Sequence, residues 1–224
     1  MVNDEIQARA QKVAAGGAAV VVYGAVRRLI RSVLWPYFRL RETGRGNLPA
    51  SGPVILAPVH RSNLDALLLA PLTRRHFRAL AKESLFKVGP FAWLLAALGA
   101  FPVRRGSADR ESIRAARSLL DGGSLLLVFP EGGRQTGDRI ADLFDGTAYL
   151  AAKTGASVVP VGISGTEEAM PTGSRFPRPG RVCVAVGQPI PPPDRRAPRS
   201  VLREWTTTLT AGLQEAQDTA ISLG

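Results

Sequence analysis

The chain has 224 residues, 45% of them hydrophobic, which is enough for one well-packed domain and excludes a disordered polypeptide. Its net charge of +11 comes mostly from arginine and favours anionic partners: nucleic acid, acidic lipid headgroups or phosphorylated substrates. Cys183 is the sole cysteine, which excludes an intrachain disulfide and agrees with a reducing, cytoplasmic-side location.

The first 42 residues are predicted to be helical. Within them the run Val13 to Val26 is apolar and uncharged, but it is shorter than the roughly 20 residues needed to cross a bilayer. Arginines follow at once, and a helix through them would carry an apolar face made of Val26, Leu29, Ile30, Val33, Leu34 and Tyr37. Two interpretations stay open: a helix lying in a membrane surface, or an amphipathic helix packed on the domain itself.

The remainder, residues 43–224, alternates short apolar runs with amphipathic segments. After a connector rich in Gly and Pro, strands are predicted at 54–58, 78–81, 100–103, 124–129, 158–163 and 182–186. Helices are predicted at 66–69, 90–98, 108–120 and 148–153, and in a last segment where Val201, Trp205, Leu209 and Leu213 form one apolar stripe. This alternation predicts an α/β fold with a mixed, largely parallel sheet flanked by helices, preceded by the N-terminal amphipathic segment.

The strongest candidate for chemistry is His60, at the end of an apolar strand, with Asp65 five residues later. In a continuous helix five residues turn through about 500°, which leaves two side chains roughly 140° apart. The pair can therefore meet only if His60 precedes the helix and Asp65 lies in its first turn. An imidazole held by a carboxylate is a general base that can activate a hydroxyl group. Taken singly, each residue also has a structural explanation, as a packed strand-end histidine and a helix-start aspartate.

Two later turns follow predicted strands and carry charge. Arg104 and Arg105 end a short apolar strand, where they can hold a phosphate or form a solvated basic turn. Glu131 and Arg134 lie in the tight turn Phe129 to Arg134, where a carboxylate beside a basic residue can bind a polyol hydroxyl and a phosphate. The alternative for that turn is a surface ion pair.

The order and spacing of these elements resemble those of the glycerolipid acyltransferases, whose best-known members are the 1-acylglycerol-3-phosphate acyltransferases. His60 and Asp65 match the family's first motif, a His followed after four residues by an Asp. Residues 99–105 resemble its Gly-x-x-x-x-Arg motif, and residues 129–134 its Phe-Pro-Glu-Gly-Thr-Arg motif.

Two further segments extend the resemblance to about residues 50–190. Leu80-Ala81-Lys82-Glu83 is similar to the Ala-Lys-x-x-Leu element between the first two motifs, and residues 158–163 resemble the fourth motif. Gly133 stands where the family usually has Thr, which leaves the identity of the acceptor open.

The resemblance implies that His60 deprotonates a glycerolipid hydroxyl while it attacks an acyl thioester, and that Asp65 orients the imidazole. It also implies that the acceptor, most simply 1-acylglycerol-3-phosphate, is bound by Lys82, Arg104, Arg105, Glu131, Gly132 and Arg134. Acyl-CoA or acyl carrier protein would be the co-substrate, with no other cofactor and no metal. An anionic membrane surface is the expected partner, and the cytoplasmic face the expected location of a peripheral or monotopic enzyme.

Other functions have less support in the sequence, whether they change the acceptor of the acyl transfer or the class of protein. Another lysophospholipid, a glycolipid or an acylated sugar would change only the acceptor. The charge alone is compatible with a non-enzymatic binder of anionic lipid or nucleic acid, but nucleic acid is not expected because no helix-turn-helix, zinc or aromatic RNA-binding signature occurs. A hydrolase would need a Gly-x-Ser-x-Gly elbow, which is missing, and two histidines and one cysteine far apart argue against a zinc site.

Overall fold

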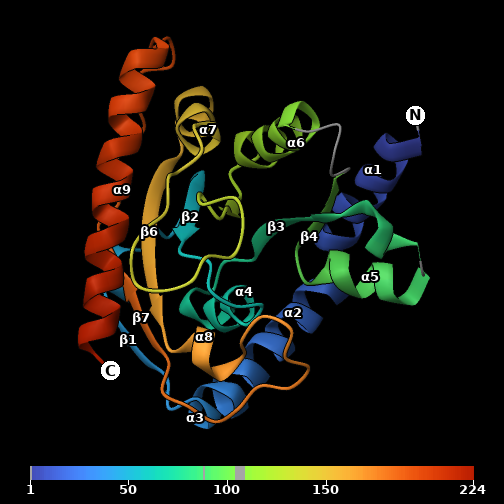
Figure 1. The fold of residues 1–224 in the computed structure, drawn as a ribbon. Helices are drawn as coiled ribbons and strands as arrows, with labels where there is room; N and C mark the ends of the chain where they lie inside the picture. Colours follow the sequence, from blue (N-terminus) through green and yellow to red (C-terminus); the bar gives the residue numbers. More distant parts are fainter. Residues whose placement is uncertain (1, 88, 104–108) are drawn as a thin grey trace.

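The computed structural model of the chain describes residues 2–87, 89–103 and 109–224 (Figure 1). Within these residues a seven-stranded sheet has the order β1-β7-β6-β2-β5-β3-β4. The strands are β1 (Arg41–Thr43), β2 (Val54–Pro58), β3 (Phe77–Lys82), β4 (Ala100–Val103), β5 (Leu125–Leu127), β6 (Ser157–Ser164) and β7 (Cys183–Val186). Strands β2 to β6 run parallel, while β7 is antiparallel to β6 and parallel to β1. The prediction of a mixed, largely parallel sheet is confirmed.

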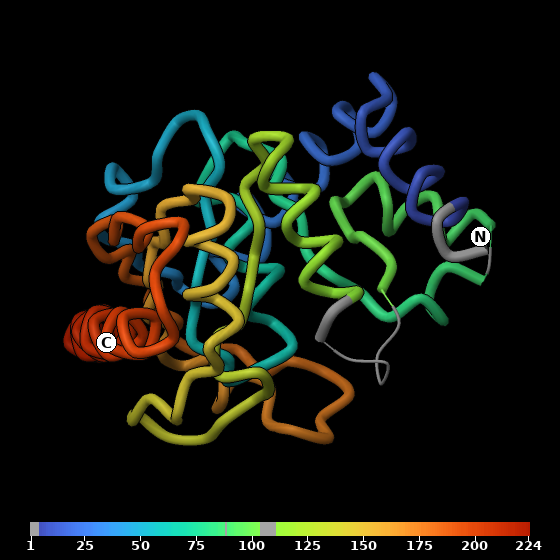
Figure 2. Tube along the Cα trace, turned by 90° about the horizontal axis from the view of Figure 1, so that it is seen from above, coloured from blue at the N-terminus to red at the C-terminus, as the bar shows by residue number. Residues whose placement is uncertain are grey.

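Helices cover both faces of this sheet. They are α1 (Val2–Ala15), α2 (Gly17–Leu29), α3 (Trp35–Tyr37), α4 (Asp65–Leu69), α5 (Gly89–Ala97), α6 (Asp109–Asp121), α7 (Gly146–Thr154), α8 (Thr166–Ala169) and α9 (Arg199–Ser222). Seen from above in Figure 2, the N-terminal helices and α9 lie on opposite sides of the molecule.

Alternation along the strands produces two cores, one on each face. Val54 and Leu56 of β2 point into the core beneath α4 and α8, while Ile55 and Ala57 point into the core beneath α6, α7 and α9. Because both faces are buried, these strands read in the sequence as continuous apolar runs.

Helix α9 makes a close contact with β6. A Cβ at Gly162 would lie 2.1 Å from the carbonyl oxygen of Ala216, so only glycine fits. Gln217 Oε1 accepts the backbone N–H of Ile163 at 2.9 Å, which satisfies a buried donor at the strand end. The fourth sequence motif therefore contains the residue that lets the last helix dock on the sheet.

The N-terminal segment departs from the sequence prediction in two ways. The helix breaks at Gly16 and contains a π-helical turn, Ile30–Leu34, and residues 41 and 42 belong to β1 instead of a helix. The helical prediction for those two residues is wrong because β1 is a polar strand held by pairing with β7. The proposed division into segment 1–42 and domain 43–224 stays a prediction.

Part of the N-terminal apolar face packs on the domain, and part of it is exposed and free to lie in a membrane surface. Tyr23, Ile30 and Trp35 are buried against the domain, whereas Val21 and Leu29 are 71% and 60% exposed. No single helix among the described residues has the length and apolar character for a membrane crossing. The pair Glu5–Ala15 and Gly17–Tyr37, bent by 70°, meets that criterion by length and composition.

Candidate active site

His60 and Asp65 are brought together by a strand–turn–helix segment. His60 follows the last residues of β2, and Asp65 is the first residue of α4. His60 Nδ1 lies 3.0 Å from Asp65 Oδ2. The same oxygen accepts the backbone N–H groups of Arg61 at 2.7 Å and Ser62 at 2.8 Å, so the carboxylate shapes the turn as well as the imidazole. The geometric condition derived from the spacing is confirmed.

This arrangement determines which imidazole nitrogen is available as a base. The Asp65 side chain is fully buried, and an ionised carboxylate only accepts hydrogen bonds, so Nδ1 carries the proton. The lone pair is then on Nε2. The His60 side chain keeps 19% of its surface exposed, and its ring stacks on Phe129 at 3.9 Å between centroids. The imidazole is thus fixed on one side and reachable on the other.

Glu131, in the turn that follows the neighbouring strand β5, binds the turn that carries His60. Its Oε2 accepts the backbone N–H of His60 at 3.1 Å and Nη1 of Arg61 at 2.8 Å, and its Oε1 accepts the backbone N–H of Ala141 at 3.1 Å. The Arg61 and Glu131 side chains are 3% and 0% exposed, which makes this a buried ion pair. The ion-pair partner of Glu131 is therefore Arg61, and its expected acceptor contact stays a prediction.

Arg61 links this pair to the loop that follows. Its Nε donates to the Gly137 carbonyl at 2.8 Å and its Nη2 to the Arg139 carbonyl at 3.1 Å. Gln135 N–H donates to the His60 carbonyl at 2.8 Å. The Arg61 guanidinium, the His60 carbonyl and the Glu131 carboxylate together hold residues 135–141 against the histidine turn.

Gly132 occupies a position that requires glycine. Its φ is +72°, and a Cβ there would lie 2.4 Å from the Phe144 ring. Its N–H donates to the Phe129 carbonyl at 3.0 Å. The backbone N–H of Gly132 is therefore used within the turn in this conformation.

Two of the cationic residues predicted to bind phosphate, Lys82 and Arg134, lie at or after the ends of strands that finish at the same edge of the sheet as β2. Lys82 is exposed at the end of β3 and pairs in register with Val103 of β4. Arg104 and Arg105 follow Val103 and lie outside the described residues. Strand β3 is two positions from β2, roughly 10 Å by ordinary strand spacing. Arg134 is exposed in the turn after β5.

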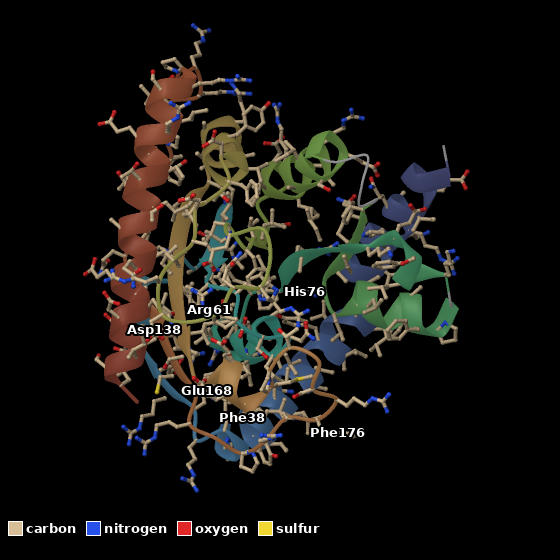
Figure 3. The ribbon with its side chains drawn as sticks, in the orientation of Figure 1. Phe38, Arg61, His76, Asp138, Glu168 and Phe176 are labelled. Atoms are coloured by element: carbon tan, nitrogen blue, oxygen red, sulfur yellow. The ribbon has the colours of Figure 1, made fainter. Side chains whose placement is uncertain are left out.

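A cavity of about 550 Å³ opens on the other side of Arg61, beside α8. Its charged lining is mixed and includes Arg39, Arg181, Asp138, Glu167 and Glu168. Figure 3 shows Arg61, Asp138 and Glu168 in this region between α9 and α8. Because acids balance the arginines, this cavity has no evident preference for a phosphate.

The second histidine, His76, lies at the opposite end of the parallel strands, where β3 begins. His76 precedes β3, and its ring packs on Tyr23 of α2 at 4.0 Å between centroids. Burial, and then the charge of Arg78, lower the pKa of His76 to about 4. Among the described residues, no group of three or more His, Cys, Asp and Glu side chains is placed to hold a metal ion.

Arg61 and Phe129 contact the site residues but are not among those predicted from the sequence. Arg61 lies between His60 and Asp65 in the chain, and Phe129 is the last residue of the strand predicted at 124–129. The signal for Arg61 was chemical: a Glu in a buried turn needs a cationic partner, and Arg61 follows a strand that could lie alongside.

Comparisons with known proteins agree with this geometry. A sequence profile of the acyltransferase family matches residues 39–164. The chloroplast 1-acyl-sn-glycerol-3-phosphate acyltransferase LPAT1 of Arabidopsis thaliana is 31% identical over 161 residues, which cover 70% of this chain and 45% of that protein. A 1-acyl-sn-glycerol-3-phosphate acyltransferase of Chlamydomonas reinhardtii is 33% identical over 188 residues, covering 77% of this chain and 56% of that protein. The chain spans about half the length of these relatives.

A solved structure has the same overall fold. The 1-acyl-sn-glycerophosphate acyltransferase PlsC of Thermotoga maritima matches with a TM-score of 0.71 and 25% identity, covering 86% of this chain and 78% of that chain. Since the profile covers more than half of the residues and includes the His60–Asp65 turn, the chain belongs to the acyltransferase family.

Proposed function

We propose that the protein transfers a fatty acyl group from an acyl thioester to the free hydroxyl of a lysophospholipid, most specifically 1-acylglycerol-3-phosphate, which would form phosphatidic acid. The observation that carries the proposal is the 3.0 Å contact between His60 Nδ1 and the buried Asp65 carboxylate, at the edge where Lys82 and Arg134 are exposed. The names of the relatives support the choice of acceptor.

The proposed reaction needs one base and no covalent enzyme intermediate. His60 Nε2 takes the proton of the acceptor hydroxyl while that oxygen attacks the thioester carbonyl. The tetrahedral oxyanion then collapses, the carbon–sulfur bond breaks, and the imidazolium returns its proton to the leaving thiolate. Asp65 stabilises the imidazolium formed between these steps, because its carboxylate is fixed 3.0 Å from Nδ1.

Acceptor binding is proposed for four cationic residues, of which Lys82 and Arg134 lie among the described residues. Lys82, Arg134 and the arginine pair Arg104–Arg105 would bind the phosphate, since guanidinium and ammonium groups match its charge. Acyl-CoA and acyl carrier protein both remain candidate donors. An acceptor with a larger or glycosidic head is the alternative, and a panel of lysolipid acceptors with one acyl-CoA separates the cases.

The direct test measures free thiol release from palmitoyl-CoA with and without 1-acylglycerol-3-phosphate. Thiol release that depends on the acceptor is expected, because the acceptor itself is the nucleophile. His60→Ala should reduce the rate by at least a hundredfold while the thermal midpoint stays near that of the parent protein. Turnover close to normal in a folded His60→Ala protein would sink the assignment of His60 as the base.

The same proposal places the enzyme at the cytoplasmic face of a membrane as a peripheral or monotopic protein. The exposed Val21 and Leu29 of α2 support it, together with the exposed Arg28 beside them. Apolar side chains rimmed by arginine are suited to the headgroup region of an anionic bilayer.

A further inference from the structure

The loop of residues 171–181 holds the most exposed large apolar side chain among the described residues. Phe176 is 81% exposed, and Figure 3 labels it at the lower edge of the molecule. The loop is orange in Figure 1, where it passes in front of α2 and α3. Because Phe176 is exposed, its side chain adds nothing to the hydrophobic core. Its position therefore needs an explanation other than folding stability.

The loop is ordered by contacts at several points along its length. Ser174 N–H donates to the Pro171 carbonyl at 3.0 Å, and Arg178 N–H donates to the Ala169 carbonyl at 2.7 Å. Tyr37 Oη donates to the Pro177 carbonyl at 3.2 Å. Proline at 171, 177 and 179 further restricts the backbone. Phe176 therefore projects from a loop whose backbone is fixed by hydrogen bonds and prolines.

The chemistry of the loop is aromatic and cationic. Arg175, Arg178 and Arg181 are exposed, and residues 171–181 contain no acid. Tyr37, which contacts the loop, is 41% exposed, and Val33 one turn earlier is 52% exposed. An apolar tip rimmed by arginine matches a surface with negative headgroups outside and hydrocarbon beneath.

The loop is also tied to the catalytic turn. Ser62 Oγ donates to the Met170 carbonyl at 3.0 Å, and Ser62 N–H donates to Asp65 Oδ2 at 2.8 Å. Two hydrogen bonds thus connect the start of the loop to the carboxylate that orients His60. A surface bound by this loop would lie beside the active site.

We propose that residues 171–181 form a membrane-docking loop, in which Phe176 enters the interface of an anionic bilayer and Arg175 and Arg178 contact lipid phosphates. The loop holds the His60 turn against the surface that contains the lipid acceptor. This role is additional to the anchoring by α2, and it depends on the proposed function only for the nature of that acceptor.

The test is cosedimentation of the full chain with vesicles of phosphatidylcholine and phosphatidylglycerol, compared with phosphatidylcholine alone. Phe176→Ser should lower the partition coefficient roughly tenfold, because transferring a phenylalanine side chain from water into an apolar environment is favourable by at least the free energy that corresponds to this factor. Replacing Arg175 and Arg178 by Glu should weaken it at least fivefold for each arginine, only on the anionic vesicles. These positions are exposed, so unchanged thermal midpoints should accompany the losses.

Matched controls lie at the other end of the molecule. Val201→Ser removes an apolar side chain that is 41% exposed on the first turn of α9, and Arg195→Glu with Arg196→Glu repeats the charge change in the loop before α9. Both controls should bind vesicles like the parent. Loop variants that bind like these controls would overturn the proposal.

Activity separates this proposal from two others. With acceptor in vesicles, the loop variants should lose rate in parallel with binding. A loss confined to acyl carrier protein as donor, with vesicle binding intact, would make the loop a protein-docking surface and overturn the proposal. Absence of acceptor-dependent thiol release in the parent, with loop-dependent vesicle binding retained, would refute the proposed function and support the docking loop.

Discussion

At the scale of single residues, the candidate site contains two buried carboxylates, Asp65 and Glu131, whose hydrogen-bond partners are other groups of the protein. Asp65 Oδ2 serves one imidazole and two backbone donors, and Glu131 serves two backbone donors and one guanidinium. Such groups are costly to bury unless each is paired, and here their partners are the turns that carry His60. The orientation of His60 and the local folding of its turn therefore depend on the same carboxylate atoms.

Glu131→Gln tests whether this carboxylate positions His60 or binds the acceptor. Glutamine keeps one acceptor oxygen but leaves the buried Arg61 guanidinium without its counter-charge. The free energy of unfolding should fall by about 2–4 kcal/mol. Because His60 N–H also loses an ionised acceptor, kcat should fall while the acceptor KM changes little, as measured by steady-state kinetics and urea unfolding.

The control for this variant is Glu168→Gln, which removes the same charge from an exposed position on α8. It should leave stability and kcat near their parent values. If Glu131→Gln instead raises the acceptor KM with stability and kcat unchanged, the carboxylate contacts the acceptor directly and the positioning role is wrong.

The sequence was sufficient to pair His60 with Asp65, but not to identify the ion-pair partner of Glu131. His60 and Asp65 could be paired because their spacing left only one arrangement in which they meet. Glu131 had two possible arginine partners, the nearby Arg134 and the distant Arg61, and proximity along the chain favoured the wrong one. Only the pairing of β2 with β5 brings Glu131 to Arg61, and register between strands is a tertiary property.

At the scale of elements, the strands buried on both faces were predictable and the polar ones were not. Strands β2 and β6 are continuous apolar runs bounded by turn residues, and their predicted ranges agree with the structure within one residue at each end. β1 has three residues, Arg41–Thr43, with no apolar pattern, and exists because β7 supplies hydrogen-bond partners. In the N-terminal segment, α1 packs against α5 and β4, α2 packs against α5 beyond the break at Gly16, and the π-helical turn packs against α4.

The exposed stripe of α2 gives a prediction at this scale. Val21→Asp with Leu29→Asp places two charges at positions that are 71% and 60% exposed, so the fold should tolerate them. Binding to anionic vesicles should weaken by at least tenfold, because a charge disfavours entry into the interface and the apolar contact is lost. Cosedimentation measures this, with Val201→Asp on α9 as the exposed apolar control. Equal binding by both proteins would show that α2 is not part of the membrane surface.

At the scale of the whole molecule, the proposed catalytic histidine and the second histidine lie at opposite ends of the parallel strands. His60 follows the carboxyl end of β2, where the charged turns gather, and His76 precedes the amino end of β3, where α2 and α5 pack. Parallel strands make this separation possible, because every strand from β2 to β6 delivers its following loop to the same edge.

His76 should make the stability of the fold depend on pH. Its pKa falls from 6.5 to about 4 in the folded protein because burial, and then the charge of Arg78, oppose protonation. Below pH 6.5 the unfolded chain therefore binds a proton that the folded protein refuses, and stability is lost as the pH falls towards 4. Above 6.5 the imidazole is neutral in both states, so the group adds no pH dependence there.

His76→Gln isolates this contribution from every other titrating group. Between pH 7 and pH 5 the parent should lose about 1 kcal/mol more of its unfolding free energy than the variant, a value that allows for solvent screening of the partly exposed imidazole, as measured by urea unfolding at both pH values. His60 and all carboxylates are shared by the two proteins, so their effects cancel in the difference. Parallel losses in parent and variant would mean that His76 is protonated as readily in the folded protein as in the unfolded chain. The contact between α2 and the sheet would then be insensitive to acid, and the stacking of Tyr23 on His76 would persist with a charged imidazole.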